Sequence, residues 1–264
     1  MAMKTAADFD PEVLILFDAY VHGALDRRGF LDKATKYAVG SVTAAVLLEQ
    51  LSPKFAEAQV IPKADARLTT EFVSYPSPQG YETTRGYLVK PKGATGKLPG
   101  ILVVHENRGL NPRIEDIARR LALENYIVFA PDALAPLGGY PGDEDKARAL
   151  FGTLEQPKTR EDMAAAFRFL KSHPGSTGKV GAVGFCYGGG ITHMLATKLP
   201  DLAAAVPFYG NNPPPETAAT IKAPLLVHLA EKDERINAAW PAYEAALKAA
   251  NVKYTAHVYP GAQH

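Results

Sequence analysis

The chain has a single cysteine, Cys186, and the residues around it form the pattern of a turn that presents a nucleophile. Gly184 and Gly188 enclose it in the order G-x-C-x-G, and no G-x-S-x-G occurs in the sequence. The apolar segment 179–184 before the motif is typical of a buried strand, and the segment 188–198 after it is typical of a helix. In such a strand–turn–helix the central residue is strained, and side chains at the glycine positions would collide with neighbouring backbone. We therefore expect the Cys186 thiol to project above a sheet as a nucleophile.

Two backbone N–H groups near this turn are candidates for an oxyanion hole. Tyr187 directly follows the nucleophile, and the helix that begins there adds its positive end, which favours a thiolate at Cys186. Asn107 follows the predicted strand 98–105 and would supply a second N–H at the same edge of the sheet. Together these groups predict a site that stabilises negative charge on the oxygen of an attacked carbonyl.

A carboxylate and a histidine follow at the positions where partners of the nucleophile are expected. In folds with this turn the order along the chain is nucleophile, acid, base. Asp233 follows the predicted strand 224–230, in a loop that also contains Glu231 and Glu234. His264 follows the turn after the last predicted strand, at the same edge of the sheet. We choose Asp233 by its position as the residue that orients His264, the predicted base.

The other histidines lie in less suitable places for a base. His22 belongs to the N-terminal segment, His173 ends a predicted helix, and His193 lies inside another helix. His228 and His257 lie within predicted strands, where we expect core histidines.

Glu106 is a fourth candidate, because it follows the strand 98–105 and would share the edge of the sheet with Cys186. A carboxylate beside a thiol can hold it by a hydrogen bond, or accept its proton when substrate arrives. The alternative is a structural salt bridge between Glu106 and Arg108 or Arg113.

With these motifs in this order, the chain resembles the dienelactone hydrolase family over about residues 68–264. The resemblance rests on these elements: His105-Glu106-Asn107-Arg108-Gly109-Leu110-Asn111, Ala130-Pro131-Asp132, the Cys186 turn, Asp233, and Pro260-Gly261-Ala262-Gln263-His264. It implies an α/β-hydrolase fold, a triad of Cys186, Asp233 and His264, and pairing of Glu106 with the resting thiol until substrate displaces it. It also implies hydrolysis of the enol-lactone ring of dienelactone through an acyl-enzyme on cysteine, without a metal or another cofactor.

Two features depart from the family. The substrate-binding arginine that the family carries shortly after Pro131-Asp132 has no counterpart, because the sequence continues Ala-Leu-Ala-Pro-Leu over 133–137. A neutral ester or lactone is therefore as suitable a substrate as a dienelactone carboxylate. Family members also continue beyond the position of His264 through a final helix that packs on the sheet. Two alternatives are open here: this segment is missing from the given sequence, or the protein lacks it.

Alternating strands and helices predict the fold of residues 61–264. Two β-rich segments separated by a Pro- and Gly-containing turn, 69–75 and 83–90, predict an antiparallel opening pair. Further strands are predicted at 98–105, 126–130, 179–184, 203–209, 224–230 and 254–259. Helices are predicted at 112–124, 159–172, 188–198 and 238–250, the second opened by the capping box Thr159-Arg160-Glu161-Asp162. This alternation is typical of an α/β fold with a doubly wound, mostly parallel sheet and helices on both faces.

Residues 1–60 have a different character. Arg27-Arg28, the small and mostly apolar run 37–48, and the small-x-small triplet 56–58 follow the order of a twin-arginine export signal. The apolar run is too short to be a stable membrane anchor. With this signal the mature protein would begin near Gln59 and be periplasmic or exported.

The alternative for residues 1–60 is an N-terminal helical extension of a cytoplasmic protein. Phe9-Asp10-Pro11 could begin an amphipathic helix, whose apolar face would pack on the domain or on a partner.

Composition limits the remaining possibilities. With 29 basic and 28 acidic residues the net charge is +1, and no charged block calls for a nucleic-acid partner. One cysteine excludes an internal disulfide and a multi-cysteine metal site. A length of 264 residues, 47% of them hydrophobic, is enough for one sizeable domain.

The leading hypothesis is a hydrolase of small carboxylic esters or lactones that uses a Cys-His-Asp triad. A broad-specificity carboxylesterase and a non-catalytic binding protein on a degenerate hydrolase scaffold are the alternatives. The expected partner is a small-molecule ester or lactone, and the oligomeric state is left open.

Overall fold

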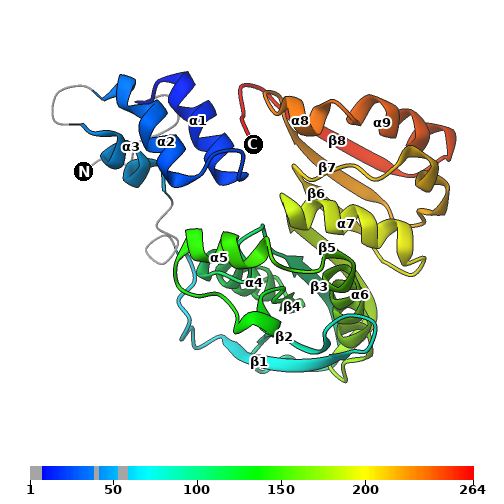
Figure 1. The fold of residues 1–264 in the computed structure, drawn as a ribbon. Helices are drawn as coiled ribbons and strands as arrows, with labels where there is room; N and C mark the ends of the chain where they lie inside the picture. Colours follow the sequence, from blue (N-terminus) through cyan, green and yellow to red (C-terminus); the bar gives the residue numbers. More distant parts are fainter. Residues whose placement is uncertain (1–7, 39–41, 53–58) are drawn as a thin grey trace. The chain divides into compact units, whose positions relative to one another are not determined.

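The computed structural model describes residues 8–38, 42–52 and 59–264, which belong to two compact units, Met1–Glu57 and Ala58–His264 (Figure 1). We call them the N-terminal unit and the larger unit. Each has a hydrophobic core formed by its own residues.

The N-terminal unit consists of short helices: α1 Pro11–Val21, α2 Arg27–Ala34, η2 Thr35–Tyr37 and α3 Ala44–Leu51. Asp10 and Asp26 cap α1 and α2, because each carboxylate accepts a hydrogen bond from a backbone N–H of the first turn. Tyr20 and Phe30 pack with ring centroids 5.7 Å apart. The core around these rings is completed by Ala34, Ala44 and Leu48.

The features predicted in residues 1–60 are distributed over this unit. Arg27 and Arg28 are the first two residues of α2. The apolar run 37–48 extends from the end of η2 into α3, and its residues 39–41 lie outside the described residues, as does the triplet 56–58. Among the described residues, no helix combines the length and hydropathy needed to cross a membrane. The export signal and the helical extension both remain predictions.

The larger unit is built on an 8-stranded sheet with the order β1-β2-β4-β3-β5-β6-β7-β8. The strands are β1 Leu68–Ser77, β2 Glu82–Pro91, β3 Leu98–Val104, β4 Ile127–Pro131, β5 Ser176–Phe185, β6 Ala205–Phe208, β7 Leu225–Ala230 and β8 Tyr254–Tyr259. β2 is antiparallel to its neighbours β1 and β4, and the other pairs are parallel. The predicted antiparallel opening and mostly parallel sheet are confirmed.

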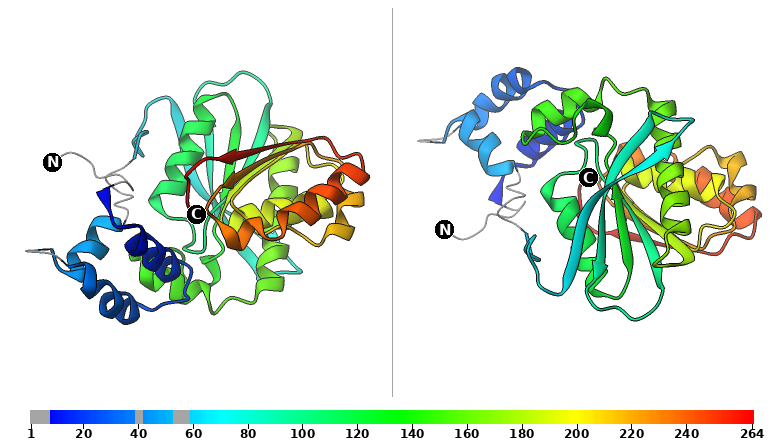
Figure 2. Two further views of the ribbon diagram at one scale, coloured as in Figure 1. Left: turned by 90° about the horizontal axis from the view of Figure 1, so that it is seen from above. Right: turned by 90° about the horizontal axis from the view of Figure 1, so that it is seen from below.

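Helices cover both faces of this sheet (Figure 2). They are α4 Pro112–Leu123, α5 Glu144–Phe151, α6 Gln156–Ser172, α7 Tyr187–Lys198, α8 Glu234–Asn237 and α9 Trp240–Ala249, with the 3-10 helices η3 Ala135–Leu137 and η4 Pro215–Thr220. α4 packs on β2, β3 and β4 from one face, whereas α6 and α7 pack on the sheet from the other. The predicted α/β-hydrolase fold is confirmed.

The central strands are apolar throughout because both of their faces are buried. In β3, Leu102 lies in the core beneath α6 and α7, and the next residue, Val103, lies in the core beneath α4. In β4, Phe129 lies in the core beneath α6 and α7, and Val128 lies in the core beneath α4. Successive residues of a strand point to opposite faces, so a strand between two helical layers needs apolar residues at every position.

The first described residues of the larger unit are hydrogen-bonded to α4. Asp116 of α4 accepts hydrogen bonds from the backbone N–H groups of Val60, at 3.1 Å, and Ile61, at 2.8 Å. The buried Arg119 donates to the Ile61 carbonyl at 2.9 Å and to the Gln59 side chain at 2.9 Å. The residues at which the mature chain is predicted to begin are therefore part of the larger unit.

The predicted capping box of the helix 159–172 is wrong. α6 begins earlier, at Gln156. Thr159 is buried inside the helix, where its hydroxyl donates to the Glu155 carbonyl at 3.2 Å. Asp162 accepts a hydrogen bond from the backbone N–H of Tyr81 at 3.0 Å. The carboxylate thus stabilises the turn between β1 and β2 instead of a helix end.

The prediction that His228 and His257 are core residues is also wrong. His228 is half-buried and His257 is exposed, and their rings stack with centroids 5.7 Å apart. Phe208 stacks on His228 at 4.0 Å, and Tyr259 is hydrogen-bonded to its Nδ1 at 2.8 Å. These side chains lie on the α4 side of the sheet, on the strands β6, β7 and β8.

Candidate active site

Cys186 occupies the turn between β5 and α7 with φ 52° and ψ −112°, a conformation that residues other than glycine rarely adopt. Its N–H donates to the Phe208 carbonyl at 3.1 Å, and its carbonyl accepts from the Gly190 N–H at 3.1 Å. These bonds fix the strained residue between β6 and the first turn of α7. The strand–turn–helix predicted around the cysteine is present.

Gly184 and Gly188 allow this turn to close. A Cβ at Gly184 would lie 2.0 Å from the Gly188 carbonyl oxygen, and a Cβ at Gly188 would lie 2.2 Å from the Val104 carbonyl oxygen. Because these obstacles are backbone atoms, they cannot rotate away as a side chain would. The steric reason for glycine at both positions is confirmed.

Asp233 and His264 are hydrogen-bonded to each other through Oδ2 and Nδ1. The other carboxylate oxygen accepts from the Ile236 N–H at 3.2 Å, so that Asp233 also caps α8. Burial by itself would raise the pKa of Asp233, but the hydrogen bond from His264 and the His264 charge outweigh it and lower the pKa. The Ile236 N–H and the Arg235 guanidinium act in the same direction. Asp233 is therefore an ionised carboxylate, 6% exposed, that orients an imidazole.

The thiol of Cys186 lies close to this pair. Its Sγ and a ring nitrogen of His264 are within 4.8 Å of each other. The structure thus brings together the three residues predicted as nucleophile, base and acid, whose roles stay predictions.

Glu106, at the end of β3, accepts a hydrogen bond from the hydroxyl of Tyr209, with Oε1 at 3.2 Å. The alternative for Glu106 is a salt bridge with Arg108 or Arg113, and Arg108 has another acidic partner. Its Nε pairs with Glu144 of α5 at 3.1 Å.

Tyr209 belongs to the site although the sequence did not single it out. It follows β6 with φ 36°, and its N–H donates to the His228 carbonyl at 2.9 Å. Its ring packs edge-on against His264 with centroids 4.9 Å apart. Burial, and then the negative charges of Glu106 and Cys186, raise the pKa of Tyr209 far above its ordinary value. The phenol is therefore a neutral hydrogen-bond donor in the middle of the site.

The two predicted oxyanion donors come from neighbouring strands. Asn107 lies in the turn after β3 and Tyr187 lies at the start of α7, after β5. Val104 and Gly184, near the ends of these strands, are paired in parallel register. Both N–H groups therefore belong to the same edge of the sheet.

A cavity of about 300 Å³ lies beside the turn. Tyr187 and Met194 line it from α7, Arg160 lines it from α6, and Asn212 lines it from the segment after β6. The Tyr187 hydroxyl and Asn212 Oδ1 are buried without a hydrogen-bond partner among the described residues. Arg160 is thus a cation in the lining of a cavity that includes Tyr187, the residue after Cys186.

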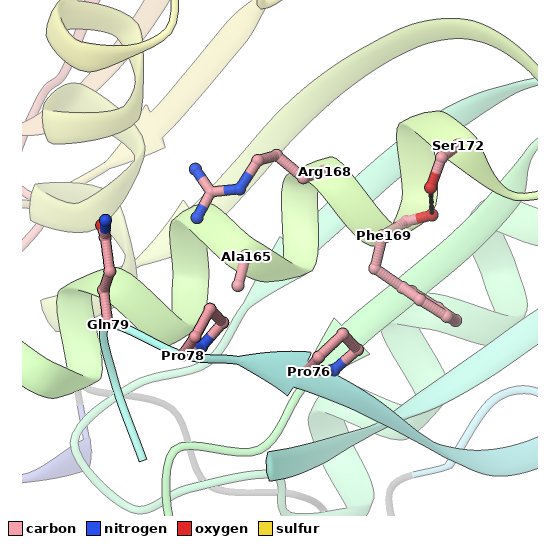
Figure 3. A pocket seen from close by; sticks show the side chains of 7 residues that line it. All are labelled: Pro76, Pro78, Gln79, Ala165, Arg168, Phe169 and Ser172. Carbon is pink, nitrogen blue, oxygen red and sulfur yellow. Dashed lines mark hydrogen bonds between the residues drawn. The ribbon is translucent and has the colours of Figure 1, made fainter. Parts of the chain in front are cut away.

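A second cavity, of about 580 Å³, lies between the end of β1 and α6 (Figure 3). Pro76 and Pro78 line one side of it, and Arg168 and Phe169 line the other. Its lining includes none of the predicted site residues, so we do not assign it to the active site.

Comparisons with known proteins agree with this architecture. Residues 84–264 match the dienelactone hydrolase family, and residues 1–39 match a family described as YqhI-like. An Escherichia coli (strain K12) protein named "Putative hydrolase fragment YghX" is 51% identical over 109 residues, 41% of this chain and 93% of that protein.

Two further relatives cover more of the chain. An Escherichia coli (strain K12) protein named "Putative carboxymethylenebutenolidase" is 32% identical over 219 residues, 78% of this chain and 80% of that protein. The crystal structure of a "Putative Dienelactone Hydrolase" from Klebsiella pneumoniae is 30% identical, has a TM-score of 0.64, and covers 74% of this chain and 88% of its own. The matched region contains the Cys186 turn, Asp233 and His264. The chain belongs to the dienelactone hydrolase family, whose members are hydrolases acting on an ester or lactone.

Proposed function

We propose that this chain hydrolyses small carboxylic esters or lactones through a thioester acyl-enzyme on Cys186. The observation that carries the proposal is the arrangement of the three predicted residues. The strained Cys186 holds its sulfur within 4.8 Å of a ring nitrogen of His264, and the Nδ1 of that ring is hydrogen-bonded to the buried Asp233.

In the first half of the reaction, the Cys186 thiolate attacks the carbonyl carbon of the ester. The electron pair of the carbonyl moves to its oxygen, where the N–H groups of Tyr187 and Asn107 hold the negative charge. The carbonyl then re-forms and the C–O bond of the ester breaks. His264, which carries the proton taken from the thiol, gives it to the leaving alkoxide, and Asp233 stabilises the charged imidazole until then.

In the second half, His264 removes a proton from water, and the resulting hydroxide attacks the thioester carbonyl. The C–S bond breaks, the acid leaves and the thiolate returns. In a lactone substrate the leaving alkoxide stays attached to the acyl group, so the product is a single hydroxy acid.

Glu106 acts on the resting thiol in this proposal. The hydrogen bond from Tyr209 holds its carboxylate at the edge of the site, where it can accept a hydrogen bond from the resting Cys186 thiol until His264 takes the proton. A broad-specificity carboxylesterase would use the same groups. A non-catalytic binding protein would use none of them for covalent chemistry.

The cavity beside the turn supports a substrate that carries a carboxylate. The arginine expected after Pro131-Asp132 is absent, but Arg160 lines this cavity next to Tyr187. We infer that Arg160 pairs with an acidic group of the substrate.

For the N-terminal unit, we propose an export signal that places the larger unit in the periplasm. The supporting features are Arg27-Arg28 at the start of α2 and the position of Gln59, from which the larger unit is anchored to α4. The helical extension of a cytoplasmic protein is the competing interpretation.

Replacing the nucleophile tests the covalent mechanism. We expect Cys186→Ala to abolish turnover of p-nitrophenyl esters, and the wild-type protein to show an acyl adduct on Cys186 by intact-mass spectrometry. Tyr37→Phe, in the N-terminal unit, serves as the unaffected control. Retained turnover in the alanine variant would disprove the assignment, and saturable ligand binding without an adduct would favour the binding protein.

Replacing the acid tests its two roles separately. Asparagine can still cap α8 through its side-chain oxygen, so Asp233→Asn removes the charge and keeps the cap. We expect turnover to fall on the order of 10²–10⁴-fold. Turnover within twofold of wild type would contradict the role of Asp233.

The difference in stability between the wild-type protein and Asp233→Asn should depend on pH. Because the pKa of Asp233 is lowered in the folded state, the ionised carboxylate stabilises the fold above its unfolded pKa of 3.8, and this contribution is lost as pH falls through the folded pKa. The difference in free energy of unfolding between wild type and Asp233→Asn should be largest above about pH 4 and shrink below it. Urea unfolding at several pH values measures it, and a constant difference would contradict the pairing.

Removing the charge of Arg160 tests whether this residue recognises a carboxylate on the substrate. We expect Arg160→Gln to lower kcat/KM about 3- to 30-fold for a p-nitrophenyl ester of glutaric acid with its second carboxylate free. The neutral p-nitrophenyl butyrate should be hydrolysed as before. Arg168→Gln, on the same helix but lining the other cavity, is the matched control. Equal losses for both esters would rule out recognition of a carboxylate by Arg160.

Fractionation tests the export proposal. When the full chain is produced in a bacterium with a twin-arginine pathway, we expect the periplasm to contain a form that begins near Gln59. The double variant Arg27→Lys, Arg28→Lys should stay full-length in the cytoplasm, whereas the control Arg67→Lys should be exported. A full-length wild-type protein in the cytoplasm would support the helical extension.

A further inference from the structure

His105 is a fully buried histidine at the end of β3, directly before Glu106. Both of its ring nitrogens have backbone partners. Nε2 lies 3.0 Å from the N–H nitrogen of Ala133, in the turn after β4, and Nδ1 lies 2.5 Å from the carbonyl oxygen of Glu106. The ring therefore joins two neighbouring loops at the carboxyl edge of the sheet.

These partners determine where the imidazole carries its proton. The Ala133 N–H can only donate, so Nε2 must accept with its lone pair. In a neutral imidazole the proton is then on Nδ1, which donates to the Glu106 carbonyl. Burial lowers the pKa of His105 to about 4, so the ring stays neutral at ordinary pH.

The Glu106 carbonyl belongs to the same peptide group as the Asn107 N–H. A peptide group is planar, and in the trans form its C=O and N–H point in opposite directions. A carbonyl directed at the buried His105 ring therefore directs the Asn107 N–H away from that ring. The donation from Nδ1 also polarises the peptide, which makes its N–H a better donor.

The His105 ring also lies beside the ring of Tyr187, the residue that bears the other predicted donor. Its ring stacks on Tyr187 with centroids 6.4 Å apart and an angle of 23° between the planes. Phe151 packs edge-on against both rings, at 6.3 Å from His105 and 4.7 Å from Tyr187. One rigid aromatic group thus supports both sides of the predicted oxyanion hole.

The geometry points to His105 as a positioning residue that aims the Asn107 N–H at the oxyanion formed during attack by Cys186. This role rests on the proposed function, because it matters only where a carbonyl is attacked. His105 does not touch the reacting atoms, and it acts through the peptide group between Glu106 and Asn107.

Two variants separate the hydrogen bonds of the ring. The amide nitrogen of an asparagine takes approximately the place of Nδ1, so His105→Asn keeps a donor for the Glu106 carbonyl. The amide oxygen of a glutamine takes approximately the place of Nε2, so His105→Gln keeps an acceptor for the Ala133 N–H and loses the bond to Glu106.

Two reactions of Cys186 report on different features of the site. Acylation by a p-nitrophenyl ester passes through an oxyanion, whereas alkylation by iodoacetamide at a saturated carbon does not and depends on the thiolate and its accessibility. We expect acylation by the glutamine variant to fall about 10- to 100-fold, with the loss in kcat and little change in KM. Its alkylation rate should stay within about twofold of wild type, and the asparagine variant should keep more of the acylation rate.

Three results would overturn the role of His105: wild-type acylation in the glutamine variant, equal losses in both variants, or a parallel loss of alkylation. A failure of the wild-type protein to form an acyl adduct would instead overturn the hydrolytic mechanism, and with it this role. The two failures are thus distinguishable, because the first leaves acylation of the wild-type protein intact.

A direct measurement covers the case in which the glutamine variant does not fold. Nuclear magnetic resonance of the wild-type protein with ¹⁵N-labelled histidine reports which ring nitrogen is protonated, and the signal missing from His105→Asn identifies the residue. We expect the Nδ1–H form throughout the neutral pH range. An Nε2–H form would place the acceptor towards the Glu106 carbonyl and would disprove the proposed orientation of the peptide.

Discussion

The site depends on one steric constraint, the close backbone packing around the turn at Cys186. A Cβ on Gly188 would lie 2.2 Å from the Val104 carbonyl oxygen, and one on Gly189 would lie 2.3 Å from the Phe208 carbonyl oxygen. The first turn of α7 therefore lies directly against the ends of β3 and β6. This contact holds Cys186 in its strained conformation and brings the positive end of the helix to the sulfur. A turn with larger residues could not bring the helix, Cys186 and the neighbouring strands so close together.

Parallel pairing then supplies the other groups. The strands β3, β5, β6, β7 and β8 are neighbours in that order, and each runs in the same direction as the next. The residues that follow their carboxyl ends are, in the same order, Glu106, Cys186, Tyr209, Asp233 and His264. An antiparallel strand among them would have moved its residue to the opposite edge of the sheet. The order of these residues along the carboxyl edge of the sheet is thus a consequence of strand order and direction.

The same reasoning explains what the sequence could and could not predict. The strands and the turn at Cys186 depend on local patterns of apolar residues and glycine, so their positions were predicted correctly. The positions of Asp233 and His264 followed from the topology that these patterns imply. Tyr209 was missed because its bond to Glu106 joins residues 103 positions apart, although its place after a strand end was a usable sign. The capping box at Thr159 failed because burial beside the β1–β2 turn overrides a local preference.

His105 and His264 show why residue type alone does not assign a role to a histidine at the carboxyl edge of the sheet. Both follow the carboxyl end of a strand, β3 for His105 and β8 for His264, at the edge of the sheet that carries the candidate site. His105 is enclosed by backbone groups and aromatic rings without a carboxylate on either nitrogen, so burial keeps it neutral and it can only hold a fixed pattern of donation and acceptance. His264 shares a hydrogen bond with an ionised carboxylate, and such a pair stabilises the imidazolium that proton transfer creates. The two histidines therefore differ in the partner of Nδ1, which is the Glu106 carbonyl oxygen for His105 and the Asp233 carboxylate for His264.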